Sequence, residues 1–326
     1  MLDALRRRAA QGLRGIRGKG DQSVRVAYPN LFVVGAPKSG TTSIYDYLAE
    51  HPSVFVPVRK ELHFHSSPEL RANVAGPGDA AAVRGIVTSS EEYQGYFAHT
   101  DASHTVVADV SPSYLYHARS AGRIHAVSPN ARIVVLVRDP VERAYSQYLH
   151  LVRVQRENLD FEAALDAEDA RRSAGWASMW RYVDTSRYAR QISTYLETFG
   201  SDRVLILHAE HLRAARDETM AKLFDFIGLE PVETSGLDER NAGGAARSKL
   251  VARTMAGQGI VKAAARAVVP KRYRRGVALR ALALNTGAKP QLETGARARL
   301  QEAFADEAVE LAALTGAALP WSWVRG

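Results

Sequence analysis

A lysine set among hydroxyl side chains and glycines, between residues 35 and 43, forms a pattern suited to holding an anion. The turn contains Gly40 and a single lysine, Lys38, and its hydroxyl groups belong to four residues: Ser39, Thr41, Thr42 and Ser43. Helical spacing begins at Thr41, so the first amides, from Ser39 to Ser43, are expected to have no partners within the helix. The helix dipole favours negative charge at the same place. These residues therefore predict a phosphate-binding loop.

The spacing of Gly35 and Gly40 matches the P-loop of nucleotide triphosphatases, but the position of the lysine differs. After the second glycine that motif has Lys followed by Ser or Thr, whereas this chain has Thr41 and Thr42 and carries its lysine inside the loop at Lys38. The loop is therefore not a Walker A motif. The structural alternative is a turn whose glycine and serine only cap a helix.

A second group of anion-binding residue types follows the most apolar segment of the chain. Residues 131–137 predict a buried strand, and Arg138 comes directly after it. Asp139 suits a helix N-cap and Pro140 the first helical position, which places Ser146 about two turns into the helix. A guanidinium fork and a hydroxyl can bind one phosphate monoester, although an arginine in this position can also simply pair with a nearby carboxylate.

Ionisable residues also cluster after the short predicted strand 54–56. Residues 59–65 read Arg-Lys-Glu-Leu-His-Phe-His, and ligands bind at the carboxyl ends of parallel strands. Glu61, flanked by Lys60 and His63, could accept a proton from a bound hydroxyl group. The alternative is a surface carboxylate that only pairs with a neighbouring basic side chain.

The elements that must position these residues alternate between strand and helix along the chain. We expect five strands, and the pattern predicts an α/β, P-loop-like three-layer fold with a central parallel sheet flanked by helices. Residues 66–88 are predicted to be a loop with short helices, and one helix is expected from 214 to 227 and another from 292 to about 315. The expected strands are residues 31–34, 54–56, 106–110, 131–137 and 203–207.

Composition limits the remaining choices. The 326 residues predict a basic N-terminal extension at 1–27 and a single domain at 28–326, with a mobile basic region near 240–290. The absence of cysteine excludes disulfides and thiolate metal sites and fits a reducing compartment. The net charge of +8 favours anionic partners, but the basic residues form no recognisable nucleic-acid-binding module, so no nucleic-acid partner is expected.

No apolar run has the length of a transmembrane helix, and the N-terminus lacks the apolar core of a signal peptide. The sequence therefore predicts a cytoplasmic protein. The basic segments 1–20 and 262–280 suit contact with an anionic inner membrane surface. The alternative is a frayed, solvated terminus for the first segment and a solvated helix face for the second.

Three segments resemble the family of sulfotransferases that use 3′-phosphoadenosine 5′-phosphosulfate (PAPS). Residues 37–42, Pro-Lys-Ser-Gly-Thr-Thr, resemble the 5′-phosphosulfate-binding loop of this family. Residues 134–146 resemble its 3′-phosphate-binding element. Residues 60–65 resemble the segment that carries the catalytic base in heparan-type and related bacterial members. The resemblance covers residues 31 to about 230 and implies a PAPS-dependent sulfotransferase.

The resemblance also implies a role for each group. PAPS would be the co-substrate, 3′-phosphoadenosine 5′-phosphate (PAP) the product, and no metal would be needed. Glu61 would be the catalytic base with support from His63, and Lys38 would neutralise the leaving 5′-phosphate. A basic, glycine-rich segment that contains Arg247 resembles a loop that closes over the nucleotide, with a plain linker as the alternative. The implied cofactor contacts are Lys38, Ser39, Gly40, Thr41, Thr42, Ser43, Arg138, Ser146 and Arg247.

The sequence does not identify the acceptor molecule. Residues 111–114, Ser-Pro-Ser-Tyr, resemble the family segment that lines the acceptor cleft, but heparan-modifying members generally have a lysine where this chain has Val110. That difference argues against a glycosaminoglycan and leaves the hydroxyl of a carbohydrate, a glycolipid or a secondary metabolite, with amine transfer as an alternative. Two other functions fit the motifs: a P-loop-type small-molecule kinase, dependent on magnesium and ATP, and a noncatalytic nucleotide-binding protein.

Overall fold

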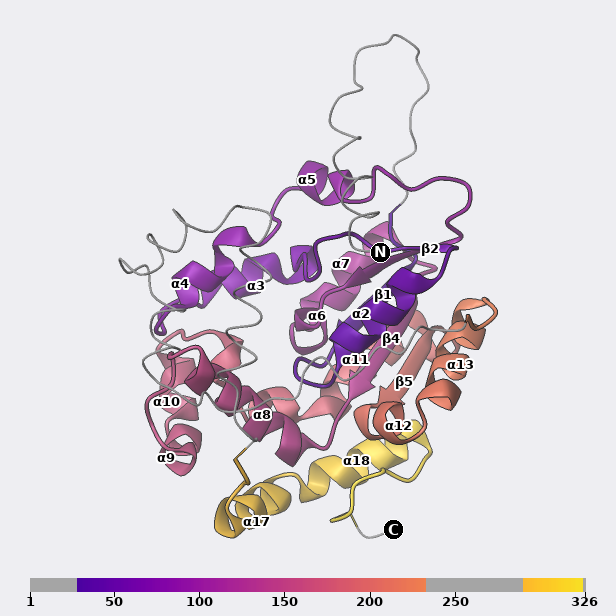
Figure 1. The fold of residues 1–326 in the computed structure, drawn as a ribbon. Helices are drawn as coiled ribbons and strands as arrows, with labels where there is room; N and C mark the ends of the chain where they lie inside the picture. Colours follow the sequence, from indigo (N-terminus) through magenta and orange to yellow (C-terminus); the bar gives the residue numbers. More distant parts are fainter. Residues whose placement is uncertain (1–27, 233–289, 325–326) are drawn as a thin grey trace, which may run out of the picture.

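A parallel five-stranded sheet forms the centre of the protein, as the computed structural model of residues 28–232 and 290–324 shows (Figure 1). The strand order is β2-β3-β1-β4-β5, and the first strand pairs in parallel with both of its neighbours. The strands are β1 (Leu31–Gly35), β2 (Val54–Phe55), β3 (Val106–Val110), β4 (Arg132–Val137) and β5 (Val204–His208).

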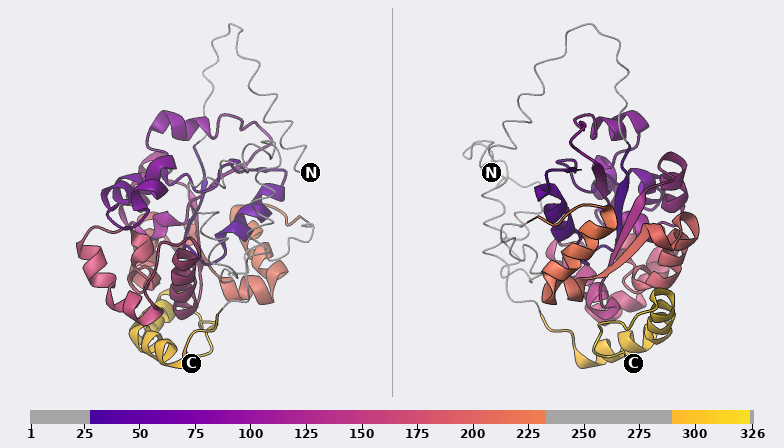
Figure 2. Two further views of the ribbon diagram at one scale, coloured as in Figure 1. Left: turned by 60° about the vertical axis from the view of Figure 1, so that its left-hand side comes forward. Right: turned by 90° about the vertical axis from the view of Figure 1, so that its right-hand side faces the viewer.

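Helices cover both faces of this sheet (Figure 2), because alternate residues of each buried strand point to opposite sides. In β1, Leu31 and Val33 pack toward α2 (Thr41–Glu50), α12 (Ala209–Ala214) and α13 (Arg216–Ile227). Phe32 and Val34 pack toward the other layer, whose helices are α6 (Ser113–Tyr116), α7 (Arg119–Val127), α11 (Tyr188–Phe199) and α18 (Ala305–Thr315). The predicted three-layer α/β fold is confirmed.

Helix α8 (Pro140–Arg153) follows β4 and begins where the sequence predicted. The Asp139 carboxylate caps it by accepting hydrogen bonds from the amides of Val141 at 2.8 Å and Glu142 at 3.4 Å. The other oxygen of the same carboxylate accepts a hydrogen bond from the indole nitrogen of Trp323 at 2.9 Å. A residue close to the end of the described chain therefore supports the start of this helix.

Short helices fill the connection between β2 and β3, as expected. They are η2 (Phe64–Ser66), α3 (Ser67–Ala72), α4 (Asp79–Ala82), η3 (Val83–Gly85) and α5 (Ser90–Gly95). Below α3 and α4 in Figure 1 lie α9 (Phe161–Asp166) and α10 (Glu168–Ser173). They are followed in the chain by η4 (Ser178–Trp180) and η5 (Asp184–Ser186).

A buried carboxylate joins these two sets of short helices. Asp79 is wholly buried and accepts hydrogen bonds from the Gly76 amide at 2.9 Å, the Ala177 amide at 2.9 Å and the Trp180 indole at 3.0 Å. It also forms an ion pair with Arg156. The α4 and η4 segments are thereby fixed to each other.

Two predicted elements differ from the structure. The single helix expected from 292 to about 315 was wrong: α17 (Thr294–Ala303) ends at Phe304, whose side chain is fully buried, and α18 begins after it. The helix expected from 214 starts instead at Arg216, because α12 precedes it as a separate turn.

Several predictions lie outside the described residues, namely those on the 1–27 extension, on the 240–290 region and on Arg247. Across 28–232 and 290–324, no helix is both long and apolar enough to cross a bilayer. The same residues contain no cluster of three or more His, Asp or Glu side chains placed to bind a metal ion.

Candidate active site

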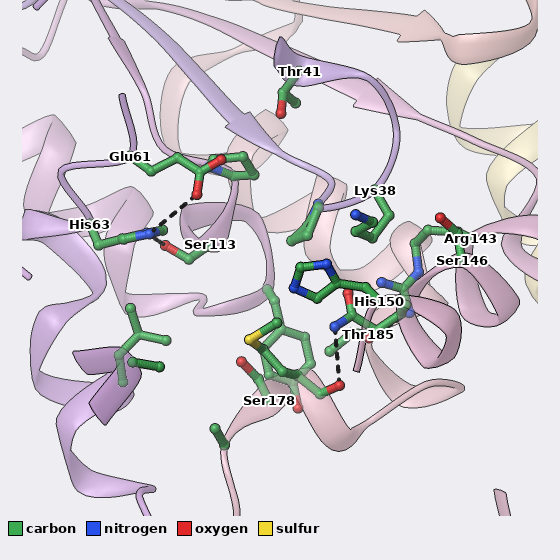
Figure 3. A pocket seen from close by; sticks show the side chains of 18 of the residues that line it. Lys38, Thr41, Glu61, His63, Ser113, Arg143, Ser146, His150, Ser178 and Thr185 are labelled. Atoms are coloured by element: carbon green, nitrogen blue, oxygen red, sulfur yellow. Dashed lines mark hydrogen bonds and ion pairs between the residues drawn. The ribbon is translucent and has the colours of Figure 1, made fainter. Parts of the chain in front are cut away.

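The predicted site residues meet around one cavity of about 410 Å³ at the carboxyl edge of the sheet (Figure 3). They converge because β1 lies next to β4, and because the segment after β2 reaches the end of β3, where the Glu61 amide donates to the Val110 carbonyl. Eight predicted residues line the cavity: Lys38, Gly40, Thr41, Thr42, Glu61, His63, Arg138 and Ser146. Ser39 and Ser43 belong to the same turn but are not among the lining residues.

The loop after β1 offers fewer free amides than the sequence predicted. The Ser39 amide donates to the Ala36 carbonyl at 3.3 Å and the Ser43 amide to the Gly40 carbonyl at 2.9 Å, so these two are not available to a ligand. Within the described residues, no backbone acceptor is found for the amides of 40, 41 and 42. Gly40 has a φ of 102°, a conformation that glycine adopts without strain, and it turns the chain into α2.

Lys38 places a cation at this loop, and no ion pair or hydrogen bond to its ammonium group is found among the described residues. Burial, followed by the charge of the nearby Arg153 guanidinium, lowers its pKa to about 8, while Glu61 acts in the opposite direction. In the described part of the chain, the buried hydroxyl of Ser39 also has no hydrogen-bond partner. A bound anion would relieve both deficits, so these residues fit a phosphate group.

Arg138 and Ser146 both line the cavity, on the side toward β5. One guanidinium nitrogen of Arg138 donates to the Lys38 carbonyl at 3.2 Å, and another lies 3.6 Å from Glu142. The Nε of Arg138 is buried and has no partner among the described residues. The carboxylate pairing that the sequence left as an alternative is therefore present, but it leaves part of the guanidinium free for a second anion.

Arg143, which sequence reasoning did not assign, lies beside Ser146 (Figure 3). It is fully buried, donating from Nε to Ser186 at 2.6 Å and from Nη2 to Thr185 at 2.8 Å. Its Nη1 has no partner among the described residues. This buried cation adds positive potential behind Arg138.

Glu61 and His63 face each other across 3.7 Å, measured from Oε2 to Nε2. The hydroxyl of Ser66 donates to the His63 carbonyl at 3.2 Å, so it must accept from Ser113, whose Oγ is 2.7 Å away. Ser113 in turn accepts from His63 Nδ1 at 2.7 Å. The neutral imidazole thus carries its proton on Nδ1 and turns the lone pair of Nε2 toward Glu61. Burial lowers the pKa of His63 and favours this neutral form.

Lys60 connects this pair to the anion-binding loop. Its ammonium group donates to the Thr42 hydroxyl at 2.7 Å and to the Thr41 hydroxyl at 3.4 Å, and it lies 3.3 Å from Glu61 Oε1. Glu61 therefore does pair with a basic neighbour, yet its side chain stays 45% exposed and lines the cavity. A hydroxyl group brought by a ligand can reach it.

His150 is a second residue that the sequence did not single out. It projects from α8 into the cavity beside Lys38 (Figure 3), one turn after Ser146. Its Nδ1 lies 3.2 Å from Arg153, and because a guanidinium can only donate, the proton of the neutral ring must be on Nε2. Burial, followed by the charge of Lys38, lowers the pKa of His150 to about 3. The ring is thus a neutral hydrogen-bond donor.

The backbone is unusual at the same residues. Four non-glycine residues in the described ranges have positive φ, and three of them line the cavity: Lys38 at 70°, Glu61 at 63° and His63 at 57°. The neighbouring strand supports two of them, since the Glu61 amide donates to the Val110 carbonyl and the His63 amide to the Ser111 hydroxyl, both at 3.2 Å. Such costly conformations cluster at functional sites, which supports this cavity as the active site.

The fold and the site together define a P-loop-like α/β protein that presents basic side chains at the carboxyl ends of adjacent parallel strands. Comparison with known proteins narrows this class. A family profile described as "Sulfotransferase family" matches residues 29–233. A sulfotransferase of Alicyclobacillus acidocaldarius superposes with a TM-score of 0.71 at 26% identity, over 92% of this chain and 100% of that structure.

Curated relatives agree with the profile. Heparan sulfate glucosamine 3-O-sulfotransferase 3A1 of Mus musculus is 27% identical over 207 residues, covering 63% of this chain and 47% of the relative. Carbohydrate sulfotransferase 15 of Homo sapiens is 27% identical over 249 residues, covering 63% of this chain and 44% of the relative. This chain therefore belongs to the sulfotransferase family, as its motifs predicted, and it spans about half the length of the curated relatives it matches.

Proposed function

We propose that the protein transfers a sulfonate group from PAPS to a hydroxyl group of an acceptor and releases PAP. The observation that carries the proposal is a pair of anion sites at the ends of two adjacent strands, β1 and β4, with a carboxylate beside the first. A nucleotide with phosphates at both its 5′ and 3′ positions needs two such sites. Membership of the sulfotransferase family supports the same donor.

PAPS supplies an activated sulfonate, whose bond to the 5′-phosphate breaks as a bond from the acceptor oxygen to sulfur forms. Lys38 and the amides of residues 40–42 hold the 5′-phosphate and stabilise the charge that it gains when it leaves. Arg138 and Ser146 hold the 3′-phosphate and so fix the orientation of the nucleotide. Arg247, outside the described residues, is proposed as a further contact.

Glu61 accepts the proton of the acceptor hydroxyl as the new bond forms. The tautomer that Ser113 selects leaves a lone pair on His63 Nε2, which faces the Glu61 carboxylate. A proton taken up by Glu61 can therefore be shared with His63. His150 can donate a hydrogen bond from Nε2 to the transferred group. The sulfonate carries less negative charge than a phosphoryl group, so the proposal assigns the stabilisation of charge to Lys38 and Arg138 and requires no metal ion.

Replacement of the proposed base tests this function. Glu61→Gln keeps the shape of the side chain but cannot take a proton, so it should bind PAP as the parent does, by calorimetry, and lose about 10²- to 10⁴-fold in turnover of PAPS. Turnover is measured as PAP release with a cell extract as the source of acceptor, and mass spectrometry locates the added sulfonate.

Glu91→Gln, a change of an exposed carboxylate on α5, is the matched control and should leave both quantities unchanged. Absence of PAP binding by the parent protein would refute the proposal. Phosphate transfer that depends on ATP and magnesium would instead support the kinase alternative. If the parent binds PAP but Glu61→Gln turns over normally, the donor assignment stands and Glu61 is not the base.

A further inference from the structure

The cavity extends beyond the groups assigned to the donor. The strand order puts Arg138, Ser146 and Arg213 on the β4 and β5 side of the anion-binding loop, whereas Glu61 and His63 follow β2, on the opposite side. If sulfonate transfer proceeds as proposed, the nucleotide occupies the first side. The acceptor must then enter from the second side to bring its hydroxyl to Glu61.

The wall on the acceptor side is mainly apolar. Five aliphatic or thioether side chains line it, and each is partly exposed, although Leu149 and Met179 also pack against the core beside α8. They come from four parts of the chain that are distant in sequence: Leu70 of α3, Val83 and Ile86 of η3 and the residue after it, Leu149 of α8, and Met179 of η4. Ser178 and Tyr116 add hydroxyl groups.

Among the described residues, little positive charge faces this wall. Arg71 and Arg84 are on the same short helices as Leu70 and Val83, but both are exposed and neither is among the residues that line the cavity. Val110, at the position where a lysine would face an acidic sugar, is buried in the core. Arg153 of α8, one turn after Leu149, does line the cavity, so among the described residues a polyanionic acceptor would find one guanidinium near this wall rather than a row of cations.

The wall is also preformed. The Asp79 carboxylate fixes α4, just before Val83, to η4, which carries Met179, through hydrogen bonds to the Ala177 amide and the Trp180 indole. The apolar surfaces on the two sides therefore keep their separation without a ligand. Small-molecule sites are commonly built in this way, with an apolar lining and a few polar groups that orient the ligand.

We propose that the acceptor is an uncharged alcohol carried by an apolar aryl or alkyl body. Its body contacts Leu70, Val83, Ile86, Leu149 and Met179, and its hydroxyl points to Glu61. The acceptor oxygen forms the bond to sulfur, the 5′-phosphate of PAPS leaves with the electron pair of the broken bond, and the hydroxyl proton passes to Glu61. The inference rests on the proposed sulfonate transfer.

The experiment measures PAPS-dependent sulfation of four purified alcohols by the full chain: 2-naphthol, 1-decanol, N-acetylglucosamine and a heparosan oligosaccharide. We expect kcat/KM for at least one of the two apolar alcohols to exceed that of both carbohydrates by more than about tenfold, which is the scale of selectivity that an apolar pocket provides. Val83→Asn should raise KM for the apolar alcohol by roughly tenfold and leave KM for PAPS unchanged.

Val309→Asn is the matched control, since Val309 is 70% exposed on α18 and is not a lining residue, and it should change neither constant. Faster sulfation of a carbohydrate, no sulfation of either apolar alcohol by protein that binds PAP, or a Val83→Asn variant with unchanged KM would each overturn the acceptor class while leaving the sulfotransferase function intact. Failure to bind PAP would instead refute the underlying function.

Discussion

Lys38 carries its charge at a place where burial and the neighbouring Arg153 both oppose it. Its pKa of about 8 means that the charged form predominates at neutral pH and declines as the pH rises through 8. A dianionic phosphate stabilises the charged form, so binding must raise this pKa. Affinity for PAP should therefore fall above pH 8, and at pH 8.5 binding should draw a proton from the buffer.

Calorimetry in two buffers with different ionisation enthalpies measures this proton uptake directly. Lys38→Arg is the appropriate comparison, because arginine stays charged throughout the range and leaves only the protons exchanged by the nucleotide and other groups. The parent should take up more protons than the variant at pH 8.5 and the same number at pH 6.5. If the parent and the Lys38→Arg variant take up equal numbers of protons at pH 8.5 as well as at pH 6.5, Lys38 does not titrate on binding.

Site residues that belong to a short contiguous motif could be predicted from the sequence, and those placed only by packing could not. Lys38, Glu61 and Arg138 each belong to a contiguous motif, so the sequence was enough to select them. Arg143 and His150 were missed, although their spacing from Ser146 places all three near one face of α8. A helical-face comparison would have suggested them, but only the packing shows that this face lines the cavity.

The position of Ser66 and Ser113 illustrates what sequence could not supply. Their hydroxyls are 2.7 Å apart, yet they are separated by 47 residues, and the tautomer of His63 depends on both. No local pattern encodes such a contact. It arises because η2 and α6, which follow different strands, pack together in the folded protein.

At the scale of elements, the short helices between β2 and β3 depend on Asp79. Removing a buried carboxylate leaves the Arg156 cation and three hydrogen-bond donors without their partner. Asp79→Ala should lower the free energy of unfolding by about 3–5 kcal/mol, the usual result of breaking a buried ion pair on one side. Urea unfolding followed by circular dichroism provides the measurement.

Asp169→Ala is the corresponding change at an exposed pair, where the carboxylate is 85% exposed and lies 2.8 Å from Arg172. Its effect should stay within about 0.5 kcal/mol, since surface substitutions and exposed ion pairs contribute little. If the two variants unfold at the same urea concentration, Asp79 does not hold these helices together.

Elements with local signals were predictable, and their interruptions were not. Asp139 and Pro140 predicted the start of α8, and the apolar segments predicted every strand of the described sheet. The break between α17 and α18 was not predicted, because the helical pattern of the sequence continues across it. Only the burial of Phe304 between the two helices decides where the chain bends.

At the scale of the whole molecule, the C-terminal segment stabilises the start of a helix that is distant in sequence. Trp323 donates to Asp139 over a separation of 184 residues, and Asp139 caps the helix that carries Ser146 and His150. Trp323→Phe should reduce stability by about 0.5–1.5 kcal/mol, the net value of one hydrogen bond. It should also speed amide hydrogen exchange in the first turn of α8.

Trp321→Phe provides the comparison for this experiment. The indole nitrogen of Trp321 has no hydrogen-bond partner among the described residues, so its loss removes packing without removing a helix cap. Exchange at Val141 and Glu142 should then remain at the parental rate. Faster exchange at these two amides in both variants would attribute the effect to packing rather than to the hydrogen bond.

The strand order of the sheet has a consequence for how this scaffold can be re-engineered. The anion-binding loop and α8 follow β1 and β4, while residues 66–88 form an excursion between β2 and β3. A chimera that exchanges this excursion for that of another family member would leave the loop after β1 and helix α8 unchanged, provided that the grafted segment brings a carboxylate to the place of Asp79. Under the proposed function, this exchange would replace Leu70, Val83 and Ile86 of the acceptor wall and keep Leu149 and Met179, so acceptor choice could change in part without a change in donor use.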